Sequence, residues 1–166
     1  MKRWLLRLGL LAGLVALGFW GWHVLFPGPE QVIRRRLNEL ARAATIAPNE
    51  SPLARLYNAQ KLAGFFTPDV EVMVDVPGYS LHTFSGRDNL IEAATGARST
   101  FGSLTVELVD IEVSMNSDKR SARVDLTAKV NRPGESTPQP QELKVDFKKI
   151  DGEWLIDRAE TVRPLR

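Results

Sequence analysis

The feature that most constrains this chain is an uninterrupted apolar run close to its N-terminus. Residues 8–26 contain no acidic, lysine or arginine side chain. As a helix this run would rise about 28 Å, close to the ~30 Å hydrocarbon core of a bilayer. Trp4 precedes the run, and Trp20 and Trp22 lie near its end, where indole rings favour the membrane interface. The sequence therefore predicts a membrane helix within residues 4–26.

A cleaved secretory signal peptide is the alternative, because a basic start followed by an apolar run also describes one. The bulky stretch 19–23 shows no small-x-small cleavage pattern, which favours a retained signal anchor. Three basic residues before the run favour a cytoplasmic N-terminus. We therefore expect a single-pass membrane protein, with residues 1–27 as N-terminus and anchor. Domain 28–166 is then extracytoplasmic, which means periplasmic in a Gram-negative bacterium.

The charge and composition of the chain exclude several classes of function. Residues 1–36 contain six basic side chains and one acidic side chain, Glu30. The rest of the chain therefore holds 16 basic and 19 acidic residues. A slightly acidic domain lacks the positive field that binds a phosphate backbone. Without cysteine the chain has no disulfide, thiolate metal site or thiol nucleophile. Phosphate-loop, dinucleotide, serine-hydrolase and zinc-protease motifs are also missing, so we expect no nucleic-acid partner, no metal and no cofactor.

Three segments of the domain show the spacing typical of helices. The first runs from about 29 to 47. The second opens at Ser51, which can cap it, and ends at 67–69. The third opens with a capping-box pattern at 85–88 and ends near Gly96. The buried face of the second helix is expected to consist of its large apolar residues, namely Leu53, Leu56, Tyr57, Leu62, Phe65 and Phe66.

Alternating apolar and polar residues predict strands in the rest of the domain. Two short strands are expected within about 70–84, the first with its valines on one face. After Phe101 the pattern predicts four long antiparallel strands. Between Leu108 and Val109 the alternation shifts by one residue, which predicts a β-bulge that bends the sheet. Asp151-Gly152 predicts a two-residue hairpin turn before the last strand.

This order of elements predicts an α+β fold in which three helices pack on a strongly bent, mostly antiparallel sheet. The result is a cone that can hold a pocket between helices and sheet. Three local patterns carry a family resemblance: Phe65–Val72, Phe84–Leu90 and Phe147–Ile156. They resemble the NTF2-like superfamily, the SnoaL-like and ketosteroid-isomerase-like group, over about residues 29–163. The resemblance implies a fold but no single activity, because the family includes enzymes, ligand carriers and assembly proteins.

The resemblance also suggests where a catalytic base would lie. In isomerase-like members the base comes from the first strand, where this chain offers Asp75. The alternation points Asp75 away from the valines, so a solvent-facing position is the competing interpretation. His82, the only histidine of the domain, can act as a base or a pocket donor, or lie on the outer surface. Tyr57 can replace the tyrosine donor that the first helix lacks, although a core tyrosine is the plainer interpretation.

The residues expected at a ligand pocket are Tyr57, Tyr79, His82 and Trp154, of which Trp154 can instead be a packing residue. Two functions remain open. One is a membrane-tethered, non-catalytic binding or assembly module with a protein partner in the cell envelope. The other is a carrier of a small apolar ligand, or an isomerase or dehydratase-like enzyme that uses the cone pocket. A homodimer through the sheet face, where Leu155 is expected to be exposed, fits both.

Overall fold

The structure is a computed structural model that describes residues 28–75, 82–134 and 140–162. The chain divides into two compact units, Met1–Val32 and Ile33–Arg166, and the fold belongs to the second unit. In the described residues we find no helix of the length and hydropathy that a bilayer span requires. The predicted membrane helix within residues 4–26 and Tyr79 lie outside the described residues.

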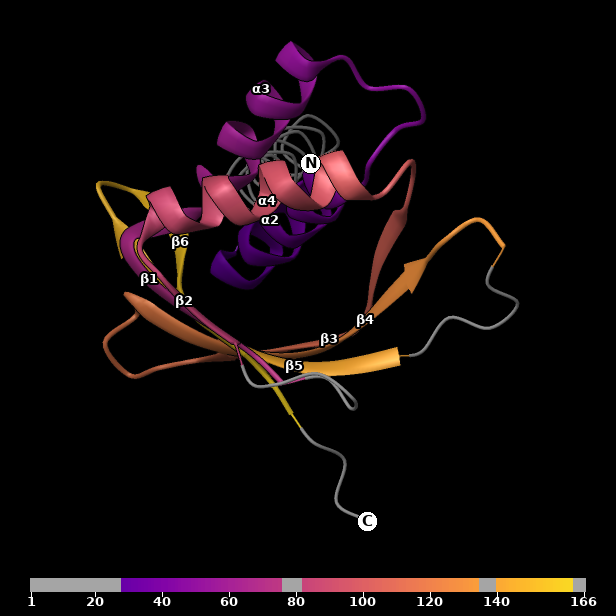
Figure 1. The fold of residues 1–166 in the computed structure, drawn as a ribbon. Helices are drawn as coiled ribbons and strands as arrows, with labels where there is room; N and C mark the ends of the chain where they lie inside the picture. Colours follow the sequence, from indigo (N-terminus) through magenta and orange to yellow (C-terminus); the bar gives the residue numbers. More distant parts are fainter. Residues whose placement is uncertain (1–27, 76–81, 135–139, 163–166) are drawn as a thin grey trace, which may run out of the picture. The chain divides into compact units, whose positions relative to one another are not determined.

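Three helices lie on one side of a six-stranded sheet (Figure 1). The helices are α2 (Pro29–Ala44), α3 (Pro52–Ala63) and α4 (Arg87–Thr100). The strands are β1 (Phe66–Val74), β2 (His82–Ser85), β3 (Thr105–Met115), β4 (Ser121–Asn131), β5 (Pro140–Ile150) and β6 (Glu153–Thr161). The sheet order is β2-β1-β6-β5-β4-β3, in which β1 and β6 are parallel and the other neighbours antiparallel. The predicted α+β architecture is confirmed.

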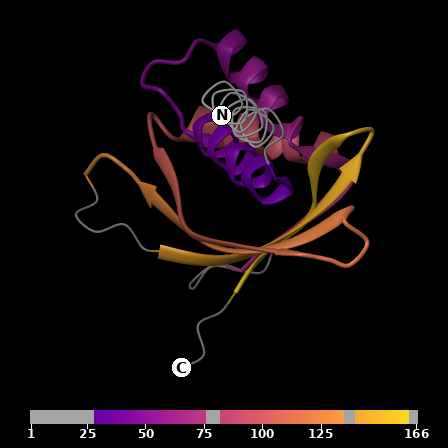
Figure 2. The same cartoon turned by 180° about the vertical axis from the view of Figure 1, so that it is seen from behind.

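The sheet is strongly bent, and the pairing of its strands shifts register in three places. Between Val109 and Glu112 the pairing of β3 with β4 shifts, and Asp110 within the shift has φ 53°. The predicted β-bulge is therefore confirmed. The turn before β6 is also confirmed, because Asp151 and Gly152 have φ 50° and 89°, as a type I′ turn requires. Seen from behind, the sheet curves around the helices (Figure 2).

The core of the second unit lies between α2 and the middle strands. Ile33 and Leu37 of α2 are fully buried. Alternate residues of β4, β5 and β6 face them because paired residues of neighbouring strands share one side of a sheet. These buried strand residues are Ala122, Val124, Leu126, Ala128, Val145, Phe147, Trp154 and Ile156.

The prediction that the large apolar residues of the second helix are buried is wrong for three of them. Leu53, Leu56 and Tyr57 are 79%, 43% and 65% exposed, while Ala59 and Ala63 are buried. The reason is that α3 packs on α4 rather than directly on the sheet. The small alanine side chains allow the two helices to approach closely, so the large apolar residues lie on the outer side. The helix also ends at Ala63, and the expected helix end at 67–69 belongs to β1.

The third helix begins within the expected stretch 85–88, but its expected cap and its expected end are wrong. Its N-cap is Gly86, with φ 84° and no side-chain capping bond, so the pattern at 85–88 is not a capping box. Gly86 instead donates its N–H to the Val70 carbonyl at 2.8 Å, which joins the start of α4 to β1. Gly96 does not end the helix, which continues to Thr100.

Candidate functional site

Strand pairing places β1 and β2 side chains on the concave face of the sheet. His82 pairs with Val74, and Phe84 pairs with Val72. Val72 in turn pairs with Ala159 of β6, and Ala159 pairs with Val145 of β5, which belongs to the buried core. Because directly paired residues share a face, His82 and Phe84 lie on the same concave face as the core.

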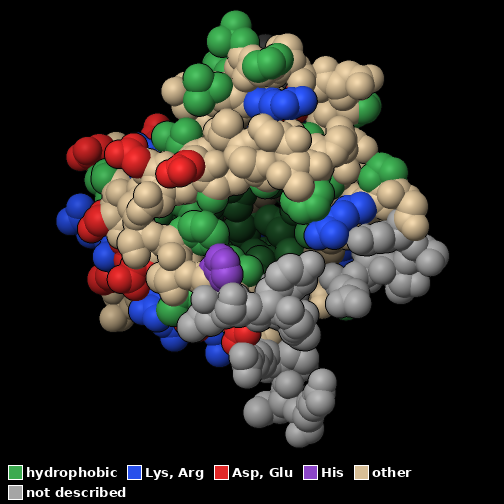
Figure 3. Space-filling view, viewed as in Figure 1, with side chains coloured by type: hydrophobic (Ala, Val, Ile, Leu, Met, Phe, Trp, Pro, Cys, Tyr) green, Lys and Arg blue, Asp and Glu red, His purple; other side chains and the backbone are tan. Residues whose placement is uncertain are grey.

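This end of the concave face is incompletely covered. The side chains of Val72, Val74, Phe84, Leu143 and Ala159 are only half-buried, although they share the face of the buried centre. The space-filling view shows a hollow beneath α4, lined by hydrophobic side chains (Figure 3). We call this hollow the open end. Its chemistry is that of a binding surface for apolar groups.

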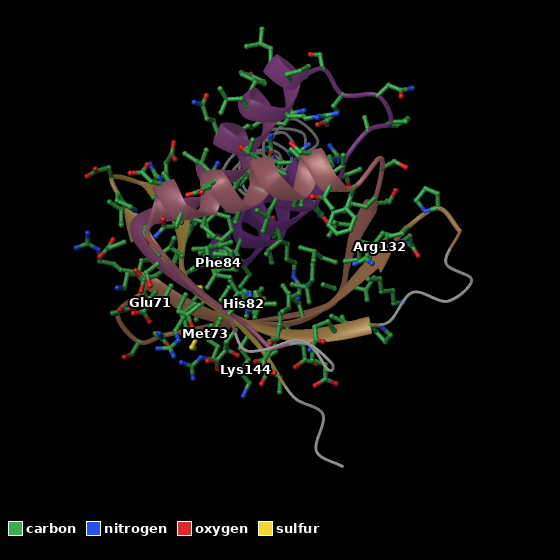
Figure 4. All side chains as sticks on the ribbon, viewed as in Figure 1. Glu71, Met73, His82, Phe84, Arg132 and Lys144 are labelled. Atoms are coloured by element: carbon green, nitrogen blue, oxygen red, sulfur yellow. The ribbon has the colours of Figure 1, made fainter. Side chains whose placement is uncertain are left out.

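Polar side chains stand at the edge of the open end. Figure 4 labels His82 on β2 and Arg132 just beyond β4, and the hollow that Figure 3 shows in the same view lies between them. The imidazole of His82 lies 6.5 Å from the ring of Phe84, between centroids. The guanidinium carbon of Arg132 lies 4.8 Å from the ring centroid of Phe101, a distance suited to a cation–π contact.

A cleft of about 420 Å³, lined by both polar and apolar residues, adjoins Arg132. Ser103 before β3, Thr105 at the start of β3 and Asn131 at the end of β4 contribute its polar groups. Thr105 and Asn131 pair with each other out of phase with the buried Ala128, so they lie on the convex side of the sheet. The loop on its other side is fixed, because the Ile46 N–H donates to the Leu104 carbonyl at 2.9 Å and the reverse bond measures 3.2 Å. The cleft therefore has hydroxyl and amide groups beside a segment that is hydrogen-bonded to the edge of the sheet.

The residues predicted at the site are not all brought together. His82 is exposed at the open end, whereas Tyr57 lies on the exposed surface of α3. Trp154 is 3% exposed, with the Lys149 ammonium 5.9 Å from its ring centroid. Tyr57 thus lies on an outer surface and Trp154 in the core. Tyr79 is outside the described residues.

Asp75 lies just beyond the end of β1 and is half-buried. Its backbone N–H donates to the Thr161 hydroxyl at 2.7 Å. The same hydroxyl donates to the Asp75 carbonyl at 3.1 Å. This pair of bonds fixes the backbone where β1 ends beside β6.

A buried ion pair was missed by the sequence analysis. Arg98 of α4 donates from Nη1 to both carboxylate oxygens of Glu50, at 2.8 and 3.0 Å, and their side chains are 2% and 6% exposed. Arg98 also donates to the Ala43 carbonyl, and Asn58 donates to Glu50 at 3.1 Å. Burial alone would raise the pKa of Glu50, but the hydrogen bonds and charge of Arg98 hold this pKa below its ordinary value.

This ion pair joins α4 to the end of α2 and to the segment before α3, so it holds the helix that covers the open end. Its members are 48 positions apart in the sequence. No periodic pattern links such positions. The only local signal for this ion pair is Arg98 itself, a long basic side chain among small and polar residues in the last turn of α4.

The convex face of the sheet is rich in charged side chains. Arg123 and Asp146 pair at 2.9 Å, and Lys148 and Asp157 pair at 2.8 Å. Such partly exposed pairs contribute little to stability, because solvent screens them. Leu155, expected to be exposed on this face, is half-buried. Among the described residues no group of three histidine or acidic side chains is placed to hold a metal ion.

Comparison with known proteins finds likeness only at the level of structure. No family model and no curated protein matches the chain. A putative scytalone dehydratase from Novosphingobium aromaticivorans is 19% identical, with TM-score 0.58 over 80% of this chain and 83% of that one. An NTF2-like protein of unknown function from Pseudomonas putida is 12% identical, with TM-score 0.63 over 85% and 90%.

A domain of unknown function from Nostoc punctiforme, described as having a cystatin-like fold, is 14% identical. Its TM-score is 0.64, over 85% of this chain and 80% of that one. Identities this low carry information about fold and none about activity. The described domain therefore has the NTF2-like, cystatin-like fold, in which three helices cover a bent six-stranded mixed sheet.

Proposed function

We propose that this chain is a non-catalytic binding module whose ligand is a small, largely apolar molecule held in the open end. The observation that carries the proposal is the half-buried state of Val72, Val74 and Phe84 on a face whose centre is fully packed. Covering apolar surface contributes roughly 25 cal/mol per Å². A ligand that fills the hollow would complete the burial that the helices leave unfinished.

The apolar character of the hollow supports binding over catalysis. General acid–base chemistry requires titratable groups within hydrogen-bond reach of the reacting atoms. Of the three candidate catalytic residues, Tyr57 lies on the exposed surface of α3 and therefore does not join His82. Likeness to a putative scytalone dehydratase makes a dehydratase-like enzyme the alternative, with His82 as its base.

The test is equilibrium binding of a neutral fluorescent probe, N-phenyl-naphthylamine, to the purified full-length chain. Phe84→Asp places a charge on the concave side of β2, and Thr83→Asp places the same charge on the outer side of the same strand. We expect Phe84→Asp to weaken binding about tenfold or more, because a carboxylate next to an apolar ligand must lose water. Thr83→Asp should bind like the unmodified chain. Equal binding by both variants would place the probe elsewhere, and chemical conversion of a bound ligand would favour the enzyme.

The role as an assembly module is favoured by a different observation. A groove of about 530 Å³ between α3 and α4 is lined by the apolar Leu56 and Ile91 together with the acidic Asp88 and Glu92. We propose that it takes a helix of an envelope protein that carries leucines and a basic residue on one side, because the acidic groups would repel an anionic lipid surface.

A photoreactive side chain at position 56 tests this proposal in the full-length chain. A cross-link to a basic amphipathic helix is expected, and the same side chain at Thr105, far along the chain on β3, is the control. A cross-link to a second copy would replace this partner with a homodimer. A cross-link to lipid alone would remove the proposal.

The membrane anchor within residues 4–26 and the extracytoplasmic location of the domain belong to the same proposal. Their support is the apolar run with its flanking tryptophans. We expect the full-length chain to stay in the membrane fraction after alkaline extraction. Protease added to intact spheroplasts should digest the domain, and a domain that is protected there and digested after lysis would contradict the orientation.

A further inference from the structure

We propose that the ligand of the open end is an amphipathic acid, with its apolar body on the concave face and its carboxylate at Arg132. This inference rests on the proposed function and adds the chemical class of the ligand. Its basis is the contrast between the apolar lining of the hollow and the basic side chain at its edge (Figures 3 and 4).

The position of Arg132 suits a planar anion. Its guanidinium carbon lies over the ring of Phe101, 4.8 Å from the centroid. A guanidinium has five N–H donors in one plane, so it can stack on a ring and still donate in its plane to a carboxylate. Lysine would offer a point charge without this geometry.

The polar residues of the neighbouring cleft are not part of this head-group site. Thr105 and Asn131, which line that cleft, pair with each other out of phase with the buried Ala128, so they lie on the convex side of the sheet. The head group is therefore assigned to Arg132 alone.

The other side of the hollow sets the orientation of the ligand. Its apolar body would contact Val72, Val74 and Phe84, which are half-buried on the concave face. His82, across the hollow from Arg132, is placed to donate a hydrogen bond to a hydroxyl or carbonyl at the far end of the ligand. The arrangement therefore selects a molecule that is acidic at one end and mainly apolar along its length.

The test compares decanoate with decanol, which share a hydrocarbon chain and differ in the head group. Both are titrated into the purified full-length chain by calorimetry, below the concentration at which decanoate forms micelles. We expect decanoate to bind about tenfold tighter, because a hydrogen bond to a charged group is stronger than one between neutral groups. Arg132→Gln should reduce decanoate binding to that of decanol and leave decanol binding unchanged, whereas Arg132→Lys should retain part of the preference.

Arg123→Gln on the convex face removes the same charge away from the hollow and should alter neither affinity. Equal binding of acid and alcohol by the unmodified chain would overturn this inference and leave the apolar site intact. Binding of neither molecule would overturn the proposed function itself. An acid preference that survives Arg132→Gln would move the head group to another cation and contradict the assignment.

Discussion

The centre and the open end of the concave face have the same alternating sequence pattern and opposite degrees of burial. At the centre, Val124 and Phe147 are 0% and 2% exposed, beneath the buried side of α2. At the open end, Val72 and Phe84 lie on the same face and remain half-buried. The alternation of residues therefore decides which side of a strand faces inward, and the helices decide how much of that side is filled.

The largest expected difference between the two regions is the cost of removing an aromatic ring. Phe147→Ala should lower the free energy of unfolding by about 3–5 kcal/mol, because it leaves a cavity in a packed core. Phe84→Ala should cost less than half as much, since solvent already reaches part of its ring. Urea denaturation of both variants measures the difference. Equal costs would mean that the open end is packed like the centre.

Breaking the buried ion pair should have the next largest effect. Glu50→Gln leaves the Arg98 charge buried without its counter-ion, which typically costs about 3 kcal/mol or more. Because the pair holds α4 over the open end, probe binding should weaken together with stability. Hydrogen exchange of α4 amides measures the local effect. Unchanged exchange in α4 would show that the pair does not hold this helix.

The same pair makes stability depend on pH. The pKa of Glu50 is lowered in the folded state from its ordinary value of 4.5, so its contribution is complete above that value. The contribution is lost as pH falls through the lowered pKa, because protonation removes the charge that Arg98 binds. Below about pH 4.5, the free energy of unfolding should therefore fall more for the unmodified chain than for Glu50→Gln. If acid lowered the free energy of unfolding equally in both chains, Glu50 would not be the cause of the pH dependence.

The smallest effect is expected on the convex face. Arg123→Ala removes an exposed partner of Asp146 and should change stability only slightly, because solvent screens exposed ion pairs. The change should shrink further in high salt, because screening weakens exposed charge pairs. Thermal unfolding at two salt concentrations measures both. A larger effect would indicate that this face is covered, as a homodimer through the sheet would require.

Local signals predicted the fold, and contacts between distant segments explain the errors. The bulge near Asp110 and the turn at Asp151-Gly152 depend on a few neighbouring residues, so both were predicted. The outer position of Tyr57 depends on the packing of α3 against α4, which helical periodicity does not encode.

The candidate site was predicted less completely than the fold. His82 was identified as a single histidine on a short strand, and pairing with β1 then places it on the concave face. Arg132 follows a strand in a polar stretch and showed no pattern of its own. Its importance depends on Phe101, which reaches it from the end of α4 through tertiary folding alone.

The most direct test of the open end is a methyl NMR titration of the full-length chain with decanoate. We expect chemical-shift changes at the methyl groups of Val72, Val74 and Leu143, which lie half-buried on the concave face. The methyl groups of Val124, packed in the centre, should change little. Shift changes confined to Leu53 and Leu56 on α3, with none at the three open-end residues, would contradict a binding site inside the fold.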